Sequence, residues 1–183
     1  ITSKDIDAYE RFIEQIEMSS IQKVIFISST SVYPISNSIV TEETITMNTP
    51  LSAIENLFRD TTFFETTIIR FAGLFGPGRH PGSWFKNGKT IPQPNGFVNM
   101  IHLEDCIEII HEILNQDCWG TTFNACSNDH PTRRDFYTNA RKSLNFENPI
   151  FEENSQLKYK IISSKKLQED LSYQFIHDNL LDI

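Results

Sequence analysis

The sequence has few cysteines, no long apolar run and no excess of basic residues, and each shortage excludes a class of protein. Its three cysteines, Cys106, Cys118 and Cys126, form no C-x-x-C pair. This argues against a metal finger or a disulfide framework and favours a reducing, cytoplasmic setting. No stretch approaches the roughly eighteen apolar residues that a membrane-spanning helix needs. The 16 Lys and Arg residues against 24 Asp and Glu residues give a net charge of −8, which disfavours nucleic acids and anionic membranes as partners.

The chain does contain enough apolar material for a folded core. Of its 183 residues, 39% are hydrophobic and fourteen are Phe, which excludes wholesale disorder. As a prior, this length indicates one domain or slightly more. The five histidines show no H-x-x-x-H pair or other ligand spacing, so the sequence predicts no metal site.

Hydrophobic periodicity predicts alternating helices and strands. Apolar residues recur every three or four positions over 6–16, which predicts an amphipathic helix with Ser3 as its N-cap. Short apolar runs rich in β-branched residues predict buried strands at 23–28, 66–71 and 121–125. Further helices are expected at 51–59, at 104–114 and after the capping pair Thr132 and Asp135, with a short strand near 160–162 and loops at 30–50 and 79–97.

This alternation predicts an α/β fold with a parallel sheet covered by helices on both faces. Ligands of such sheets bind beyond the carboxyl ends of the strands. These ends fall at 28–30, 71–73 and 125–126, and functional side chains are expected there.

Four segments, in order along the chain, resemble a known family. They are VIFISSTSVY at 24–33, IRFAGLFGPGR at 69–79, NMIHLED at 99–105 and FNA at 123–125. Together they resemble the extended short-chain dehydrogenases/reductases, and within them the NAD-dependent epimerase/dehydratase group. The resemblance covers most of residues 1 to about 145 and is loose over the last forty.

The resemblance implies a Rossmann-type doubly wound parallel sheet, of which this chain would be the C-terminal portion, with a small α+β substrate-binding lobe. The sheet portion would comprise 1–78 and 98–126, and the lobe 79–97 and 127–183. Family members begin with a glycine-rich turn that cradles the cofactor pyrophosphate. This chain has only seven glycines and no such turn near its start. The native protein is therefore expected to be longer by on the order of 90 residues, at ~30 per βαβ unit, and this chain alone to bind the cofactor poorly.

The resemblance also implies a cofactor, NAD or NADP, and a set of site residues. Ser29 would be the catalytic hydroxyl that holds the substrate oxygen, although it could instead cap loop backbone groups. The expected cofactor contacts are Ser28, Phe71, Ala72, Gly73 and Leu74. The expected substrate contacts are Thr30, Arg79, Trp84 and His102. The partners expected are a small-molecule substrate and a second copy in a homodimer.

The sequence departs from the family at two functional positions. No Tyr is followed four residues later by Lys, and alignment on Glu55 puts Met47 and Leu51 where the proton-transferring pair belongs. Val98 stands where nucleotide-sugar epimerases carry a phosphate-binding Arg, and Arg79 or Lys86 could take that role. The primary hypothesis is an NAD(P)-binding epimerase/dehydratase-like oxidoreductase for a small hydroxyl, keto or sugar-type substrate. The alternative is a catalytically impaired nucleotide-binding sensor or partner protein.

Overall fold

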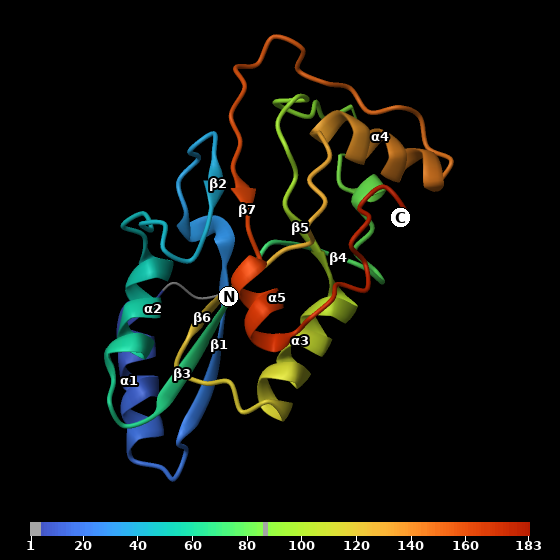
Figure 1. The fold of residues 1–183 in the computed structure, drawn as a ribbon. Coiled ribbons are helices and arrows are strands. Elements are labelled where there is room, and N and C mark those ends of the chain that lie inside the picture. The colour runs from blue at the N-terminus through green and yellow to red at the C-terminus, as the bar shows by residue number, and fades with distance from the viewer. Residues whose placement is uncertain (1–4, 86–87) are drawn as a thin grey trace.

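The computed structural model describes residues 5–85 and 88–183. It is an α/β fold in which helices pack against a parallel β-sheet (Figure 1). The predicted cap Ser3 and the candidate Lys86 lie outside these residues. The helices are α1 (Ile6–Glu17), α2 (Pro50–Asp60), α3 (Leu103–Asn115), α4 (Arg133–Ser143) and α5 (Lys165–Leu171). The strands are β1 (Lys23–Ser29), β2 (Ile39–Val40), β3 (Glu65–Phe71), β4 (Gly73–Phe75), β5 (Met100–His102), β6 (Thr122–Ala125) and β7 (Ile161–Ile162).

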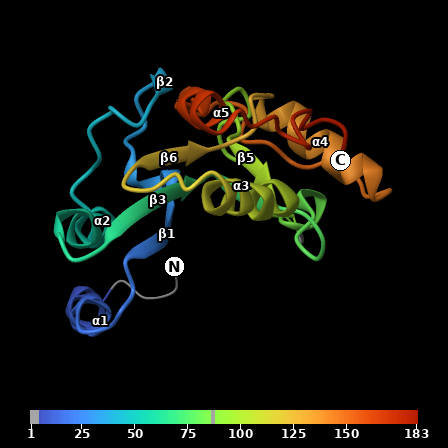
Figure 2. The same ribbon diagram turned by 60° about the horizontal axis from the view of Figure 1, so that its bottom comes forward.

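The central sheet has three parallel strands in the order β1-β3-β6. Its middle strand, β3, is buried at every position after the first, as expected for a strand covered on both faces. Figure 2 shows α1 and α2 on one side of this sheet and α3 on the other. The predicted α/β fold class is confirmed, as is a parallel sheet with helices on both faces.

Two smaller pairs of strands extend this arrangement. Strand β4 pairs in parallel with β5, directly beyond the end of β3. Strand β2 pairs in parallel with β7, which joins the long segment after β1 to residues more than a hundred positions later. Strand β2 lies within 30–50, a stretch expected to be loop throughout. A two-residue strand carries too little periodicity to be predicted from sequence.

Local chemistry sets the helix ends. The side chain of Asp5 accepts the backbone N–H of Ala8 and caps α1, so Asp5 has the role that was expected of Ser3. Helix α2 begins with a capping box in which Thr49 and Ser52 satisfy each other's backbone N–H groups. In α4 the predicted cap is confirmed, because the Thr132 hydroxyl accepts the N–H of Asp135.

The main core lies between the sheet and its helices. An aromatic group at its α1–α2 side includes Tyr9, Phe26 and Phe58, and the rings of Phe26 and Phe58 stack with centroids 4.5 Å apart. A second apolar cluster lies away from the sheet, around Phe136 and Tyr137 of α4. The division of the chain into a sheet portion and a substrate lobe stays a prediction. None of the helices within 5–85 and 88–183 is long and apolar enough to cross a membrane.

Candidate cofactor and substrate site

A cavity of about 380 Å³ opens beyond the carboxyl ends of β1 and β3. It lies there because strand register sets Ser28 opposite Arg70 and Ser29 opposite Phe71. The cavity is lined by Ile27, Ser28, Ser29, Ser31, Leu51, Phe71, Ala72, Gly73, Leu74 and Arg79. This is the place where parallel α/β sheets bind ligands.

The cavity brings together most of the site residues that the sequence predicted. Ser28, Ser29, Phe71, Ala72, Gly73, Leu74 and Arg79 all line it. The side chain of Ser29 accepts the N–H of Ser31 at 3.1 Å and so caps the short 3₁₀ helix at Thr30–Val32. A hydroxyl that accepts a bond still has its own proton to donate. Ser29 can therefore do both things that the sequence left open.

Three predicted substrate contacts lie outside this cavity. Thr30 is buried, and its backbone carbonyl accepts a hydrogen bond from Lys160. The ring of Trp84 packs edge-on against Tyr137 of the second apolar cluster. His102 is the N-cap of α3 and accepts the N–H of Glu104.

Arg79 is held at the rim of the cavity by the loop after β4. Its Nε donates to the carbonyl of Leu74 at 2.7 Å, and its guanidinium lies over the Trp84 ring at 5.4 Å. The turn closes with a bond from the Arg79 N–H to the Gly76 carbonyl, and Gly76 and Gly78 have positive φ angles that glycine adopts without strain. The side chain is exposed, so its remaining N–H groups are available to a carboxylate or phosphate.

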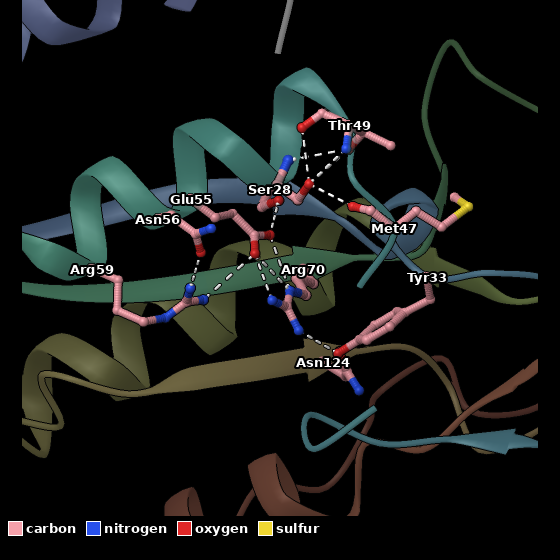
Figure 3. A network of polar contacts seen from close by, with 10 residues as sticks. Ser28, Tyr33, Met47, Thr49, Glu55, Asn56, Arg59, Arg70 and Asn124 are labelled. Carbon is pink, nitrogen blue, oxygen red and sulfur yellow. Dashed lines mark hydrogen bonds and ion pairs between the residues drawn. The ribbon is translucent and has the colours of Figure 1, made fainter. Parts of the chain in front are cut away.

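A buried polar network lies behind the cavity and fixes Ser28 (Figure 3). The Ser28 hydroxyl donates to Glu55 Oε1 at 2.5 Å, and Arg70 donates to both oxygens of the same carboxylate at 2.5–3.2 Å. Arg70 also donates to the Tyr33 hydroxyl, which donates in turn to Asn124 Oδ1 at 2.8 Å. The network therefore ties α2 to all three strands of the central sheet.

The charges of this network are matched. Burial lowers the pKa of Arg70, but the hydrogen bonds and negative charge of Glu55 outweigh it and hold that pKa above its usual value. Burial also raises the pKa of the Tyr33 phenol against the opposing effect of Arg70. Tyr33 is 1% exposed and has both bonding partners inside the protein. It therefore serves the structure and does not exchange protons with a ligand.

None of the described residues that line the cavity is suited to proton transfer near neutral pH. Leu51 lines it, at the position where the family alignment expects Lys, and the exposed Met47 stands where Tyr is expected. Among the described residues that line the cavity, Arg79 alone has an ionisable side chain, and a guanidinium keeps its proton in proteins. What remains is a set of hydroxyls and one fixed cation above an apolar floor.

Sequence reasoning missed three features of this region. Ser31 and Ile27 line the cavity although neither was singled out within the 24–33 segment. Glu55 served only to align the chain, yet it is the acceptor at the centre of the buried network. A single acidic residue on the inner face of the expected helix, facing an Arg in the next strand, was the available signal.

The fold is that of the NAD-dependent epimerases and dehydratases. The chain superposes on UDP-glucuronic acid 4-epimerase from Bacillus cereus, solved with NAD, with a TM-score of 0.79 and 17% identity over 99% of this chain and 64% of that one. It superposes on a conserved protein of unknown function from Silicibacter pomeroyi with a TM-score of 0.81 and 20% identity, covering 95% of this chain and 69% of that one. The resemblance stated from the sequence is confirmed at the level of the fold.

Among curated proteins the chain is similar to Protein YeeZ of Escherichia coli K12. The two are 33% identical over 176 residues, which is 93% of this chain and 64% of YeeZ. This chain thus spans about 64% of the length of the curated relative that it matches. No family model matches the sequence.

Proposed function

We propose that this protein is an NAD(P)-binding, epimerase/dehydratase-like oxidoreductase, with its substrate held in the cavity at the ends of β1 and β3. The observation that carries the proposal is the gathering of Ser28, Ser29, Phe71–Leu74 and Arg79 around that cavity. Solved proteins of the same fold support it, since they hold NAD in one case and NADPH in another.

The cavity residues fit the nicotinamide end of such a cofactor. The floor of the cavity is apolar, with Ile27, Leu51 and Phe71, and the rim of the cavity carries hydroxyls and Arg79. An aromatic ring with a polar amide is accommodated by this combination of surfaces. The cofactor, when bound, would supply or accept the hydride. The glycine-rich phosphate turn of the family has no counterpart in this sequence.

Ser29 and Arg79 are proposed to hold the substrate. The Ser29 hydroxyl is oriented by the N–H of Ser31 and can donate its proton to a carbonyl or hydroxyl oxygen. A donor aimed at the oxygen where charge develops stabilises the transition state. Arg79 would bind a carboxylate, phosphate or sugar hydroxyl at the cavity mouth.

A second candidate function is nucleotide binding without turnover, as a sensor or a partner protein. The specific observation in its favour is Leu51 in the cavity wall and Met47 outside it, in place of a proton-transferring pair. Without a group whose pKa lies near neutrality, hydride transfer loses the general acid–base contribution, which is typically 100-fold to 10,000-fold.

Cofactor binding and turnover, measured separately, distinguish the two functions. NADH and NADPH would be titrated into the purified full-length protein by fluorescence. Turnover of small keto substrates would be followed by loss of cofactor absorbance, and turnover of sugar substrates by analysis of the product, because an epimerase or dehydratase returns the hydride to its substrate. Ser29→Ala should lower turnover by about tenfold or more while leaving cofactor affinity unchanged. Ser36→Ala, in the exposed loop before β2, is the matched control.

Each result has a clear meaning. Turnover that survives Ser29→Ala would remove the catalytic role of Ser29. Saturable binding with no transfer on any substrate would favour the sensor function. Absence of binding of either cofactor to the full-length protein would reject both.

A further inference from the structure

Three potential metal ligands meet at the start of α3, outside the cavity described above. They are His102 and Glu104 at the helix start and His177 from the C-terminal segment. One ligand atom of each lies within 4.8 Å of the other two. The two imidazole rings have centroids 3.7 Å apart, and His177 Nε2 lies 2.8 Å from Glu104 Oε2.

Local structure orients the ring of His102. Its Nδ1 accepts the N–H of Glu104 as the helix cap at 3.3 Å, so the neutral ring carries its proton on Nε2. To bind a metal through Nε2, the ring must move that proton to Nδ1 and give up this hydrogen bond. The ring of Phe75 packs against the imidazole at 5.1 Å between centroids. A side chain at Gly76 would place its Cβ 3.0 Å from Nε2, so glycine at that position leaves space beside this nitrogen.

A buried carboxylate holds His177 in place. Asp105 is fully buried, and its oxygens accept the N–H groups of Ile176 and His177 and the hydroxyl of Tyr173. On the other side, the Ser127 hydroxyl donates to the His177 carbonyl at 2.9 Å. The backbone at His177 is thus fixed from both directions, which reduces the ordering cost of any ligand that this side chain binds.

The chemistry of the three side chains suits a cation, and their ligand atoms lie together. Two imidazoles and one carboxylate are a donor set that binds Zn²⁺ in proteins.

We propose that His102, Glu104 and His177 bind a divalent transition-metal cation of the Zn²⁺ class. Three protein ligands leave a fourth position for water, and the partial exposure of His177 and Glu104 lets solvent reach it. Because the donors come from two segments more than seventy residues apart, the cation would fasten the C-terminal segment to the start of α3. Binding would replace the direct contact between His177 and Glu104.

Direct titration of the metal tests this proposal. Untagged protein, stripped with a chelator and dialysed, would be titrated with ZnCl₂ by calorimetry and with CoCl₂ by visible absorption. One equivalent should bind, and Zn²⁺ should raise the thermal unfolding temperature, since it binds the folded state. His177→Ala and Glu104→Gln should each weaken binding by roughly tenfold or more. His111→Ala, an exposed histidine on the same helix, should leave it unchanged.

The remaining outcomes overturn the proposal. One is that the wild-type protein shows no saturable binding of Zn²⁺ or Co²⁺. Another is that the wild type and both ligand variants bind the metal equally. A third is that His111→Ala weakens metal binding as much as the ligand variants do. Cys118→Ser tests whether the partly exposed thiol is the true ligand. Unchanged binding in this variant excludes the thiol, and loss of binding would refute the proposed site. Circular dichroism of each variant separates a lost ligand from a lost fold, and Glu104→Gln keeps the test informative if His177→Ala does not fold. No readout depends on NAD(P) or turnover.

Discussion

Replacing Glu55 with glutamine is expected to destabilise the protein by about 3–5 kcal/mol. The variant keeps the size of the side chain and removes its charge. Glu55 is 1% exposed, and its carboxylate accepts bonds from Arg70 and Ser28. Arg70 is 3% exposed and cannot lose its proton, so the change leaves a buried cation without its counter-ion.

The magnitude follows from the environment of each partner. Removing one member of a buried, hydrogen-bonded ion pair costs about 3–5 kcal/mol, because the other charge stays desolvated. Ser28 can still donate to the amide oxygen of glutamine and adds little. The contact from Arg59 to Glu55 is 3.6 Å long and Arg59 is exposed, so its loss is worth at most about 1 kcal/mol. The expected cost is therefore almost entirely that of Arg70.

Urea unfolding, followed by circular dichroism, measures this cost. The urea concentration at half-unfolding should fall while the dependence of the unfolding free energy on urea concentration stays unchanged. The control is Glu169→Gln on α5, where an exposed carboxylate lies 3.5 Å from Lys165 and loss should stay within about 0.5 kcal/mol. A double variant, Glu55→Leu with Arg70→Met, removes both charges and should be less destabilised than Glu55→Gln alone. A cost below about 1 kcal/mol for Glu55→Gln, or a double variant that is less stable than it, would refute the reasoning.

Three further predictions follow from packing and burial. Phe58→Ala removes a fully buried ring stacked at 4.5 Å and should cost about 3–5 kcal/mol in urea unfolding; a loss under 1 kcal/mol would contradict it. Gly82→Ala would bring a Cβ to 2.1 Å from the Ala140 carbonyl, so it should lower stability by about 1–3 kcal/mol, and unchanged thermal unfolding would reject that contact. Burial raises the pKa of Cys106 to about 12, so a thiol reagent should label Cys118 well before Cys106 in the native protein; peptide mass spectrometry would reveal the opposite order.

Much of the central sheet could be predicted from local patterns. The strands near 23–28, 66–71 and 121–125 were recognisable because an apolar β-branched run is unusual outside a doubly covered sheet. The same reasoning placed the ends of two strands at Ser29 and Phe71, which lie in register in the structure; the roles expected of these residues came from the family resemblance. Trp84 and His102 were expected to contact substrate. Trp84 packs against Tyr137 of α4 and His102 caps α3, outside the lining of this cavity, and their contact with a substrate stays a prediction.

The sequence by itself determined the main helices, the three strands of the central sheet, and the edge of that sheet at which a ligand would bind. Those properties depend on side-chain periodicity and on capping groups within a few residues of each other. Only the tertiary structure decided that Glu55 would pair with Arg70, that β2 would join β7, and that His177 would reach His102. Each of these contacts depends on how separate elements pack, and no local spacing in the chain encodes that geometry.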